Sequence, residues 1–218
     1  KPPCPEDGLL LKVQSVGICG SDLRNMLMDS RKGNYPHIYG HEIVGVVDEI
    51  GSSEREYQVG ERLYIYTADH CLRCEPCRSG HSESCGNQGN YIERQGGFAD
   101  YVVVTAEQIS RDSVFRLPEG ISADAASLSE PLSSVYACQE NIDIRLGDSV
   151  VIIGAGPIGC FHTQLAKMRG AAKVIVVEIN DRRLETTREF GADALINSTK
   201  ADVIARVKEL TNGRGADK

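Results

Sequence analysis

The stretch that decides the fold is SVVIIGAGPIG, residues 149–159. Its first five residues form a continuous apolar run, which is typical of a parallel strand buried on both faces. The motif GAGPIG follows and opens a segment in which Ile158, Phe161 and Leu165 recur at helical spacing. A strand, a glycine-rich turn and a helix in this order predict a βα unit of a parallel sheet.

The same alternation continues towards residue 218. We expect a second strand at Lys173–Val177, a helix over 182–190, a third strand at Ala194–Asn197 and a third helix with Thr199 as its cap. Residues 134–146 are expected to form a helix and a turn that lead into the sheet. Together these elements make the first half of a doubly wound α/β domain. We therefore expect the sequence to be part of a longer protein.

An acidic residue stands at the expected end of the second strand. Glu178 lies 19 residues after Gly159, which completes the dinucleotide-binding pattern. Such a carboxylate accepts hydrogen bonds from a ribose 2′-hydroxyl and repels a 2′-phosphate, so NAD is favoured over NADP. The nearby arginines at 182 and 183 leave room for NADP. The alternative is a glycine-rich turn that binds nothing.

The residues before about 147 have a different character. Short apolar runs next to glycine turns are read as strands at Leu9–Val16, Ile43–Ile50, Arg62–Tyr66 and Ala99–Thr105. Such runs favour a β-barrel or a β-sandwich. The chain is therefore expected to hold a β-rich domain followed by an α/β domain.

Half of the 8 cysteines fall within one polar loop. Cys71, Cys74, Cys77 and Cys85 have the spacing C-x2-C-x2-C-x7-C, and we call this segment the four-cysteine loop. Four thiolates satisfy the tetrahedral preference of zinc and leave no open position, so the spacing predicts a structural zinc site. An iron–sulfur cluster also takes four thiolates, but the bacterial ferredoxin run continues with x3-C-P. Four free cysteines are the remaining alternative.

Composition excludes several classes of protein. The chain has 218 residues, with 24 lysines and arginines against 31 aspartates and glutamates, and a net charge of −7. A phosphate-backbone binder needs clustered positive charge, so nucleic acid is not an expected partner. No apolar run approaches the roughly 18–20 residues that span a bilayer, and no signal peptide is visible. We expect a cytoplasmic protein with no membrane partner, where reducing conditions favour metal over disulfides.

Three further segments carry side chains that bind metals in other proteins. GICGSDL contains Cys19, Ser21 and Asp22, YGHEIVG contains His41 and Glu42, and SLSEPLS contains Glu130. Each segment also has an ordinary interpretation on its own. Cys19 fits a core cysteine, and His41 with Glu42 fits a polar turn. Glu130 fits a helix cap or a solvated charge. Spacing alone leaves open whether they meet in one site.

Taken together, the motifs resemble those of a known family. GICGSDL, GHE before an apolar strand, the four-cysteine loop, SEPL and GAGPIG occur in this order over nearly the whole chain. This combination resembles the zinc-dependent medium-chain alcohol and polyol dehydrogenases. It is most similar to the sorbitol (L-iditol) dehydrogenase branch, with threonine and butanediol dehydrogenases close by. The resemblance implies a GroES-like β-barrel catalytic domain over residues 1–134 and a truncated Rossmann domain, α/β in class, over residues 135–218.

The resemblance also implies roles for individual residues. It assigns the catalytic zinc to Cys19, His41, Glu42 and Glu130, where a glutamate ligates directly or exchanges with water. Ser21 matches the hydroxyl that relays the substrate proton, and Asp22 matches an acid that orients a ligand. The residues that match cofactor contacts are Gly154, Gly156, Pro157, Ile158, Gly159, Glu178 and Arg183.

The activity implied by the resemblance is hydride transfer from a secondary alcohol (a polyol, sugar alcohol or amino alcohol) to NAD, with one catalytic and one structural zinc. Relatives form dimers or tetramers, so a homo-oligomer is expected. The alternative is a zinc-stabilised nucleotide-binding or interaction module without catalysis. Arg24 departs from the family pattern, because many relatives place a histidine of the proton relay there. Since arginine stays protonated, we expect it to contact an anionic group instead.

Overall fold

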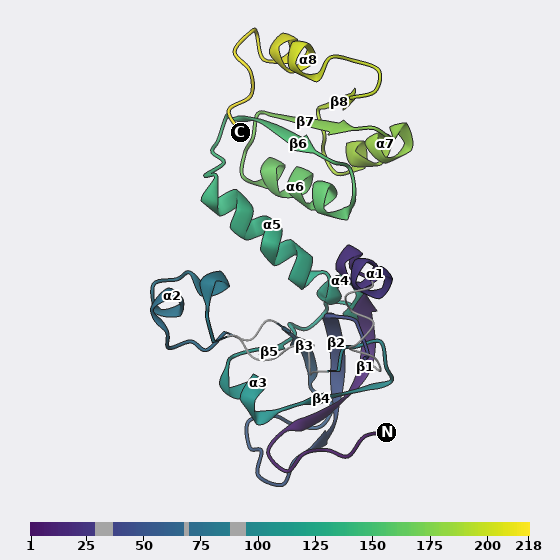
Figure 1. Cartoon of the computed structure of the whole chain (residues 1–218), viewed down its shortest axis with the longest axis vertical. Coiled ribbons are helices and arrows are strands. Elements are labelled where there is room, and N and C mark those ends of the chain that lie inside the picture. Colours follow the sequence, from purple (N-terminus) through teal and green to yellow (C-terminus); the bar gives the residue numbers. More distant parts are fainter. Residues whose placement is uncertain (29–36, 68–69, 88–94) are drawn as a thin grey trace. The chain divides into compact units, whose positions relative to one another are not determined.

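The computed structural model describes residues 1–28, 37–67, 70–87 and 95–218 (Figure 1). The chain divides into two compact units, Lys1–Glu130 and Pro131–Lys218, which we call the first unit and the second unit. The domain limit expected between residues 134 and 135 falls inside one continuous helix, α5, at Ser129–Asn141. None of the helices in the described part has the length and apolar character that crossing a membrane requires.

The first unit is built around a five-stranded antiparallel sheet in the order β4-β1-β2-β3-β5. The strands are β1 at Leu9–Gly17, β2 at Glu42–Ile50, β3 at Arg62–Ile65, β4 at Tyr101–Val104 and β5 at Val114–Arg116. The structure confirms the first four as predicted strands, with ends that shift by no more than two residues. The sequence does not predict β5, because three residues are too few to show a pattern.

Side chains alternate between the two faces of this sheet, and both faces are covered. Successive residues of β2 show the alternation. Ile43 lies in the larger core of the unit, whereas Val44 packs with Tyr64 of β3 and Ala126. Ala126 belongs to helix α4, Ala123–Ser127, which packs against β1 and β2. The face that carries Val44 therefore lies under α4, next to the start of α5.

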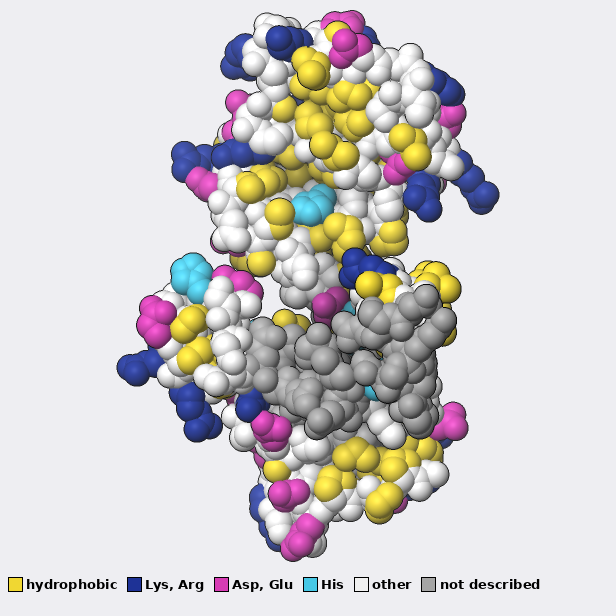
Figure 2. Space-filling model, in the orientation of Figure 1, with side chains coloured by type: hydrophobic (Ala, Val, Ile, Leu, Met, Phe, Trp, Pro, Cys, Tyr) yellow, Lys and Arg dark blue, Asp and Glu magenta, His cyan; other side chains and the backbone are white. Residues whose placement is uncertain are grey.

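Short helices complete the first unit. They are α1 at Gly20–Leu27, α2 at Glu75–Arg78, the 3₁₀ turn η2 at Ser82–Ser84, and α3 at Ala106–Ser110. Asp22 is the buried residue of α1, while Leu23, Met26 and Leu27 are exposed. Hydrophobic side chains accordingly lie at the surface over α1 in Figure 2. The position of α1 thus depends on a buried carboxylate more than on an apolar face.

The second unit contains a parallel sheet in the order β6-β7-β8. Its strands are β6 at Ser149–Ile153, β7 at Lys173–Glu178 and β8 at Ala194–Asn197. After α5, its helices are α6 at Pro157–Met168, α7 at Asp181–Glu189 and α8 at Val203–Leu210. The three strands and α7 agree with the predicted ones to within one residue.

Helices cover both faces of the parallel sheet. On one face, Val176 of β7 belongs to a cluster that includes Ala166 of α6 and Leu184 of α7. On the other face, Ile175 packs in a cluster with Val207 of α8. A parallel strand that is apolar on both sides needs a helix on each side, so this arrangement confirms the predicted α/β class.

Two local predictions are wrong. Asp202, and not Thr199, caps α8, because its carboxylate accepts a hydrogen bond from the backbone N–H of Ala205 at 3.0 Å. The helix expected from residue 134 begins earlier, with α5 at Ser129. Pro131 is tolerated in its first turn, since the N–H that proline lacks has no partner within the helix at that position. Glu130 therefore lies in the first turn of a helix.

Residues 217 and 218 lie beside β6. The N–H of Val151 donates to the carbonyl of Lys218 at 2.9 Å, and the N–H of Asp217 donates to the carbonyl of Ser149 at 2.8 Å. The Asp217 carboxylate accepts hydrogen bonds from both the N–H and the hydroxyl of Ser149. β6 is therefore hydrogen-bonded on both sides, to β7 and to these residues.

Candidate functional site

Three side chains with different ligand atoms meet at one point of the first unit. The sulfur of Cys19, an imidazole nitrogen of His41 and a carboxylate oxygen of Glu42 lie within 4.8 Å of one another. Cys19 is the N-cap of α1, directly after β1, and the other two stand at the start of β2. Because β1 and β2 pair with Gly17 opposite Glu42, the three side chains converge. We call them the triad.

The glycine opposite Glu42 makes room for its carboxylate. A Cβ atom at residue 17 would lie 1.7 Å from Oε2 of Glu42, so any other residue there would displace the carboxylate. Since β2 lies between β1 and β3, the Glu42 side chain leans over β1 and away from β3. The pairing of β1 with β2 thus positions the Glu42 carboxylate, and Gly17 leaves the space that this carboxylate occupies.

Asp22 holds two members of the triad in place. Asp22 is 2% exposed, and its carboxylate accepts hydrogen bonds from the N–H of Cys19 at 2.9 Å and the N–H of Gly40 at 3.3 Å. Its Oδ1 also lies 3.2 Å from Nδ1 of His41. With the proton on Nδ1, the Nε2 atom of His41 keeps its lone pair for a metal. Asp22 therefore sets both the position of Cys19 and the tautomer of His41.

Two further residues of α1 lie close to the triad in sequence. Ser21 is half-buried, and its Oγ lies 3.5 Å from Nε2 of His41. A hydroxyl at this place is within reach of both the triad and solvent. Arg24 follows one turn later on the same helix, with an exposed side chain.

The electrostatics of the triad favour a bound cation. Burial raises the pKa of Glu42, and the charges of Glu130 and Asp22 raise it further, while His41 lowers it. A carboxylate in these surroundings is costly unless positive charge is close. Thiolate, imidazole and carboxylate are also the three protein ligand types that zinc uses. The donor set therefore fits a zinc ion with three protein ligands and one open position.

Glu130 lies outside the triad, although its charge reaches Glu42. Burial raises the pKa of Tyr64, and the charge of Glu130 raises it further. Tyr64 is a residue of β3 that the sequence does not single out. Its hydroxyl is buried and has no hydrogen-bond partner among the described residues, which costs about 1–3 kcal/mol for such a donor. The β2–β3 register is the signal that would have identified Tyr64, and it becomes visible only in the fold.

The four-cysteine loop also brings its sulfur atoms together, within 4.8 Å of one another. The N–H of Cys71 donates to Sγ of Cys85 at 3.4 Å, and the N–H of Cys74 donates to Sγ of Cys71 at 3.3 Å. Backbone N–H groups of Arg73 and Cys74 lower the pKa of Cys71 to about 6. Burial, together with the neighbouring sulfurs, raises the pKa of Cys77 to about 12. Four sulfurs this close together can all be thiolates only beside a cation, so the loop fits a structural zinc.

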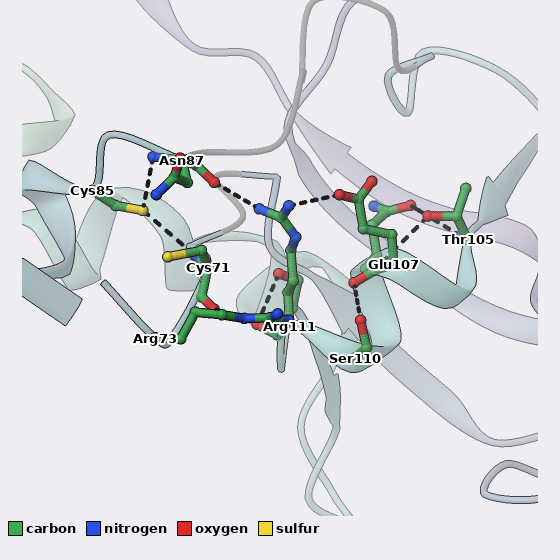
Figure 3. A network of polar contacts seen from close by, with 10 residues as sticks. Cys71, Arg73, Cys85, Asn87, Thr105, Glu107, Ser110 and Arg111 are labelled. Carbon is green, nitrogen blue, oxygen red and sulfur yellow. Dashed lines mark hydrogen bonds and ion pairs between the residues drawn. The ribbon is translucent and has the colours of Figure 1, made fainter. Parts of the chain in front are cut away.

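Arg111 ties this loop to α3 (Figure 3). Its Nη1 donates to the carbonyl of Asn87 at 2.9 Å, and its Nη2 forms an ion pair with Glu107 of α3 at 2.7 Å. The N–H of Asn87 in turn donates to Sγ of Cys85 at 3.4 Å. A continuous set of contacts thus joins a sulfur of the four-cysteine loop to the body of the first unit. The sequence gives no indication of Arg111, because this link spans 24 residues.

We expect Cys71→Ser to remove one zinc ion per chain and to loosen the four-cysteine loop. Serine is a poor zinc ligand, and the ion is what holds the sulfur cluster together. Limited proteolysis with trypsin should then cut at Arg73 and Arg78 at least about tenfold faster, since cleavage follows local opening. Cys4→Ser is the matched control, because Cys4 is a half-buried thiol outside both clusters. Unchanged zinc content and unchanged cleavage in Cys71→Ser would contradict a structural zinc here.

The GAGPIG segment forms the turn between β6 and α6. Gly154 has a φ angle of 103°, a conformation that side chains rarely adopt. A Cβ atom at Gly159 would lie 2.0 Å from the carbonyl oxygen of Gly154, whereas one at Gly156 has no atom within 4 Å. Pro157 is the first residue of α6, and Gly156 is its N-cap. The fold thus needs the outer two glycines, and the middle one leaves open space where a phosphate can approach.

The Glu178 carboxylate points towards this glycine-rich turn. It accepts hydrogen bonds from the N–H of Ala155 at 2.9 Å and from the N–H of Ile179 at 2.8 Å. These bonds, followed by the positive charge of Arg183, lower the pKa of Glu178, so the carboxylate is charged at neutral pH. Arg183 in α7 and Ile158 in α6 both have exposed side chains. The predicted cofactor residues therefore lie around one loop of the second unit.

Two family models match the chain. The model described as "Alcohol dehydrogenase GroES-like domain" covers residues 5–119, which include the triad and the four-cysteine loop. The model described as "Zinc-binding dehydrogenase" covers residues 157–218, from the first residue of α6. Together they match most of both units.

Individual proteins are similar over the whole chain. The chain is 34% identical to sorbitol dehydrogenase from Bacillus subtilis (strain 168), over 99% of the chain and 61% of that protein. It is 33% identical to L-threonine 3-dehydrogenase from Shewanella putrefaciens (strain CN-32), over 100% of the chain and 63% of that protein. The crystal structure of galactitol-1-phosphate dehydrogenase from Escherichia coli matches with a TM-score of 0.83 and 28% identity, over 97% of the chain and 61% of that structure. The chain thus spans less than two thirds of the length of each.

Proposed function

Because this chain belongs to the zinc-dependent medium-chain alcohol and polyol dehydrogenase family, we propose that the protein is an enzyme that oxidises a secondary alcohol with NAD. The hydride passes from the alcohol carbon to the nicotinamide ring and the hydroxyl proton passes to solvent, so a ketone and NADH are formed. The triad, with its sulfur, nitrogen and oxygen atoms within 4.8 Å of one another, is the observation that carries this proposal. The names of the relatives support a polyol, sugar alcohol or amino alcohol as the substrate.

Cys19, His41 and Glu42 are the residues that would hold the catalytic zinc. When it is bound, this ion lowers the pKa of the substrate hydroxyl and stabilises the alkoxide. One thiolate and one carboxylate balance the charge of Zn²⁺, whereas a second carboxylate would make the site anionic and a weaker Lewis acid. We therefore assign Glu42 as the carboxylate ligand and Glu130 as a neighbour that exchanges with water.

In this proposal, residues of α1 transfer the substrate proton and fix the position of the proton on His41. The Ser21 hydroxyl, 3.5 Å from the ring of His41, accepts the substrate proton and passes it towards solvent. Asp22 keeps the proton of His41 on Nδ1 and so keeps the other nitrogen available to the metal. The proton relay through Ser21 distinguishes an enzyme from a module that only binds zinc and nucleotide, because such a module moves no substrate proton. Arg24 contacts an anionic group of a bound ligand in this reading.

The second unit supplies the cofactor contacts in this proposal. The backbone N–H groups at the start of α6 and the open space over Gly156 suit a pyrophosphate. The charged Glu178 carboxylate suits a ribose 2′-hydroxyl and disfavours a 2′-phosphate. Pro157, Ile158 and Arg183 are the remaining cofactor-contact residues that we propose.

We also propose that the protein works in the cytoplasm as a homo-oligomer, a dimer or tetramer, and binds neither nucleic acid nor membranes. The net charge of −7 and the cluster of free thiols support this assignment. Native mass spectrometry of the protein tests the metal content and the oligomeric state together. Two zinc ions per chain, with NAD reduction on sorbitol, threonine or 2,3-butanediol, are the expected result. A single zinc that is lost in Cys71→Ser, with no turnover, would favour the non-catalytic module.

Replacing the Glu178 carboxylate is expected to shift the cofactor preference from NAD towards NADP. In Glu178→Ala the ribose hydrogen bonds are lost and the repulsion of a 2′-phosphate is relieved. The ratio of kcat/KM for NAD to that for NADP should fall at least about tenfold, as expected from losing a hydrogen bond to a charged group. Asp181→Ala is the control, since Asp181 is an exposed acid nearby that pairs with Lys200. An unchanged ratio in Glu178→Ala would rule out the ribose contact.

A further inference from the structure

The hydroxyl of Tyr64 is a buried donor without an acceptor. Tyr64 is 6% exposed, and its Oη has no hydrogen-bond partner within the part of the chain that the structure describes. The large majority of buried side-chain polar atoms in proteins are hydrogen-bonded, so an unpaired buried hydroxyl needs an explanation. A neighbouring acceptor on this face of the sheet is therefore expected for it.

The ring of Tyr64 is held in place, so its hydroxyl points in a fixed direction. Tyr64 of β3 stands opposite Val44 of β2, and both pack with Ala126 of α4. On the other side, Phe115 of β5 lies with its ring centroid 6.2 Å from that of Tyr64. Because side chains two residues apart in a strand share a face, Glu42 projects from the same face as Val44. The hydroxyl is therefore confined to the side of the sheet that carries the Glu42 carboxylate.

The charges of two carboxylates, Glu130 and Glu42, act on this hydroxyl. The charge of Glu130 raises the pKa of Tyr64 more than the charge of Glu42 does. Glu130 follows shortly after α4, the helix that covers this face of the sheet. The Glu42 side chain leans the other way, over Gly17 of β1. Glu130 is therefore the better placed acceptor, and a carboxylate has lone pairs enough to accept from several donors at once.

We propose that Tyr64 is a positioning residue of the metal centre, whose hydroxyl donates a hydrogen bond to the Glu130 carboxylate when zinc occupies the triad. This inference rests on the proposed function, since it requires zinc at the triad. The hydrogen bond fixes the orientation of Glu130 next to the metal ligands. It also gives the buried hydroxyl of Tyr64 an acceptor.

The test compares Tyr64→Phe with the wild-type protein. Phenylalanine keeps the ring among Val44 and Ala126 and removes only the hydroxyl. We expect the dissociation constant of zinc at the triad to rise about tenfold, the lower end of what losing a hydrogen bond around a metal site costs. The melting temperature of the protein without zinc at the triad should not fall, because the proposed hydrogen bond forms only when zinc is bound. With zinc bound, the melting temperature should fall.

Tyr57→Phe is the matched control. Tyr57 is also 6% exposed and lies in the first unit, but it packs in the larger core on the other face of the sheet. We expect its zinc affinity at the triad to stay within about twofold of the wild-type value. Competition with a chromophoric chelator measures the affinity, and the absorption spectrum of cobalt placed at the triad reports the ligand arrangement. The spectrum should change in Tyr64→Phe and stay unchanged in Tyr57→Phe.

A double-mutant cycle identifies the acceptor. If the hydroxyl acts through Glu130, Tyr64→Phe has no further effect on zinc affinity in a Glu130→Ala background. A full additional effect in that background would overturn the assignment to Glu130.

Different experimental results would overturn this inference and the proposed function. Two zinc ions per chain, with an unchanged affinity and cobalt spectrum in Tyr64→Phe, would overturn the inference alone. An equal loss of thermal stability with and without zinc would do the same, since it indicates a packing role. A wild-type protein that binds zinc only in the four-cysteine loop would overturn the proposed function, and this inference with it.

Discussion

Cys19→Ser is expected to lower kcat at least about a thousandfold while the protein stays folded. The thiolate of Cys19 supplies one of three ligands at the triad, and a Lewis-acid metal contributes several kcal/mol to stabilising the alkoxide. Cys19 is only half-buried at the N-cap of α1, and the Asp22 carboxylate bonds to its backbone N–H rather than to its sulfur. The substitution therefore removes the ligand and leaves the contact that holds the helix.

The measurement combines steady-state kinetics with zinc content and circular dichroism. Zinc content should fall from two ions to one, and the far-ultraviolet spectrum should match that of the wild-type protein. Cys138→Ser is the control, since Cys138 is an exposed thiol of α5 outside both sulfur clusters. A Cys19→Ser protein with wild-type turnover would refute the catalytic role of the triad.

The second large effect is expected for Gly159→Ala. The added Cβ would lie 2.0 Å from the carbonyl oxygen of Gly154, which is backbone and cannot turn aside as a side chain can. The turn between β6 and α6 must shift, at an overpacking cost of about 1–3 kcal/mol. The backbone N–H groups that we propose to hold the pyrophosphate move with it. We expect a lower melting temperature of the second unit and NADH binding that is weaker at least about a hundredfold, the loss expected for two or more charge-assisted hydrogen bonds.

Gly156→Ala is expected to weaken NADH binding without destabilising the fold. Nothing lies within 4 Å of a Cβ atom at residue 156, and its backbone is extended, with φ −79° and ψ −175°. We expect a wild-type melting temperature in the absence of ligand but NADH affinity reduced about tenfold or more, because the methyl group fills space that a pyrophosphate needs. Calorimetric titration with NADH measures both variants. Wild-type affinity in Gly156→Ala would show that the dinucleotide does not pass over this loop.

The second unit is the part of the fold that sequence patterns predict best. The three strands and α7 lie within one residue of their predicted ends, because parallel strands buried on both faces are continuous apolar runs. The error at α8 arose because Thr199 and Asp202 are both good capping residues. The carboxylate of Asp202 accepts a hydrogen bond from the N–H of Ala205, while the Thr199 hydroxyl donates to Asn197 at the end of β8.

The short helices of the first unit could not be predicted in the same way. α1 buries Asp22 and exposes Leu23 and Leu27, so it lacks the apolar stripe by which a helix is recognised. Its position comes from a local bond of Asp22 to Cys19 and from the bonds of Asp22 to Gly40 and His41, which lie 18 and 19 residues away in the chain. Only the fold brings these partners together.

By itself, the sequence predicted which types of side chain would bind metal, and it predicted the glycine-rich turn proposed to bind the nucleotide. The spacing from Cys71 to Cys85 and the glycines of GAGPIG act within a few residues, where chain connectivity limits the geometry. The tertiary structure brought the carboxylate of Glu42 to Cys19 and His41, and it buried Tyr64 on the same face of the sheet as Val44. Both outcomes depend on the register of β1, β2 and β3. A slip of one residue would turn every side chain to the opposite face, and local spacing does not encode that register.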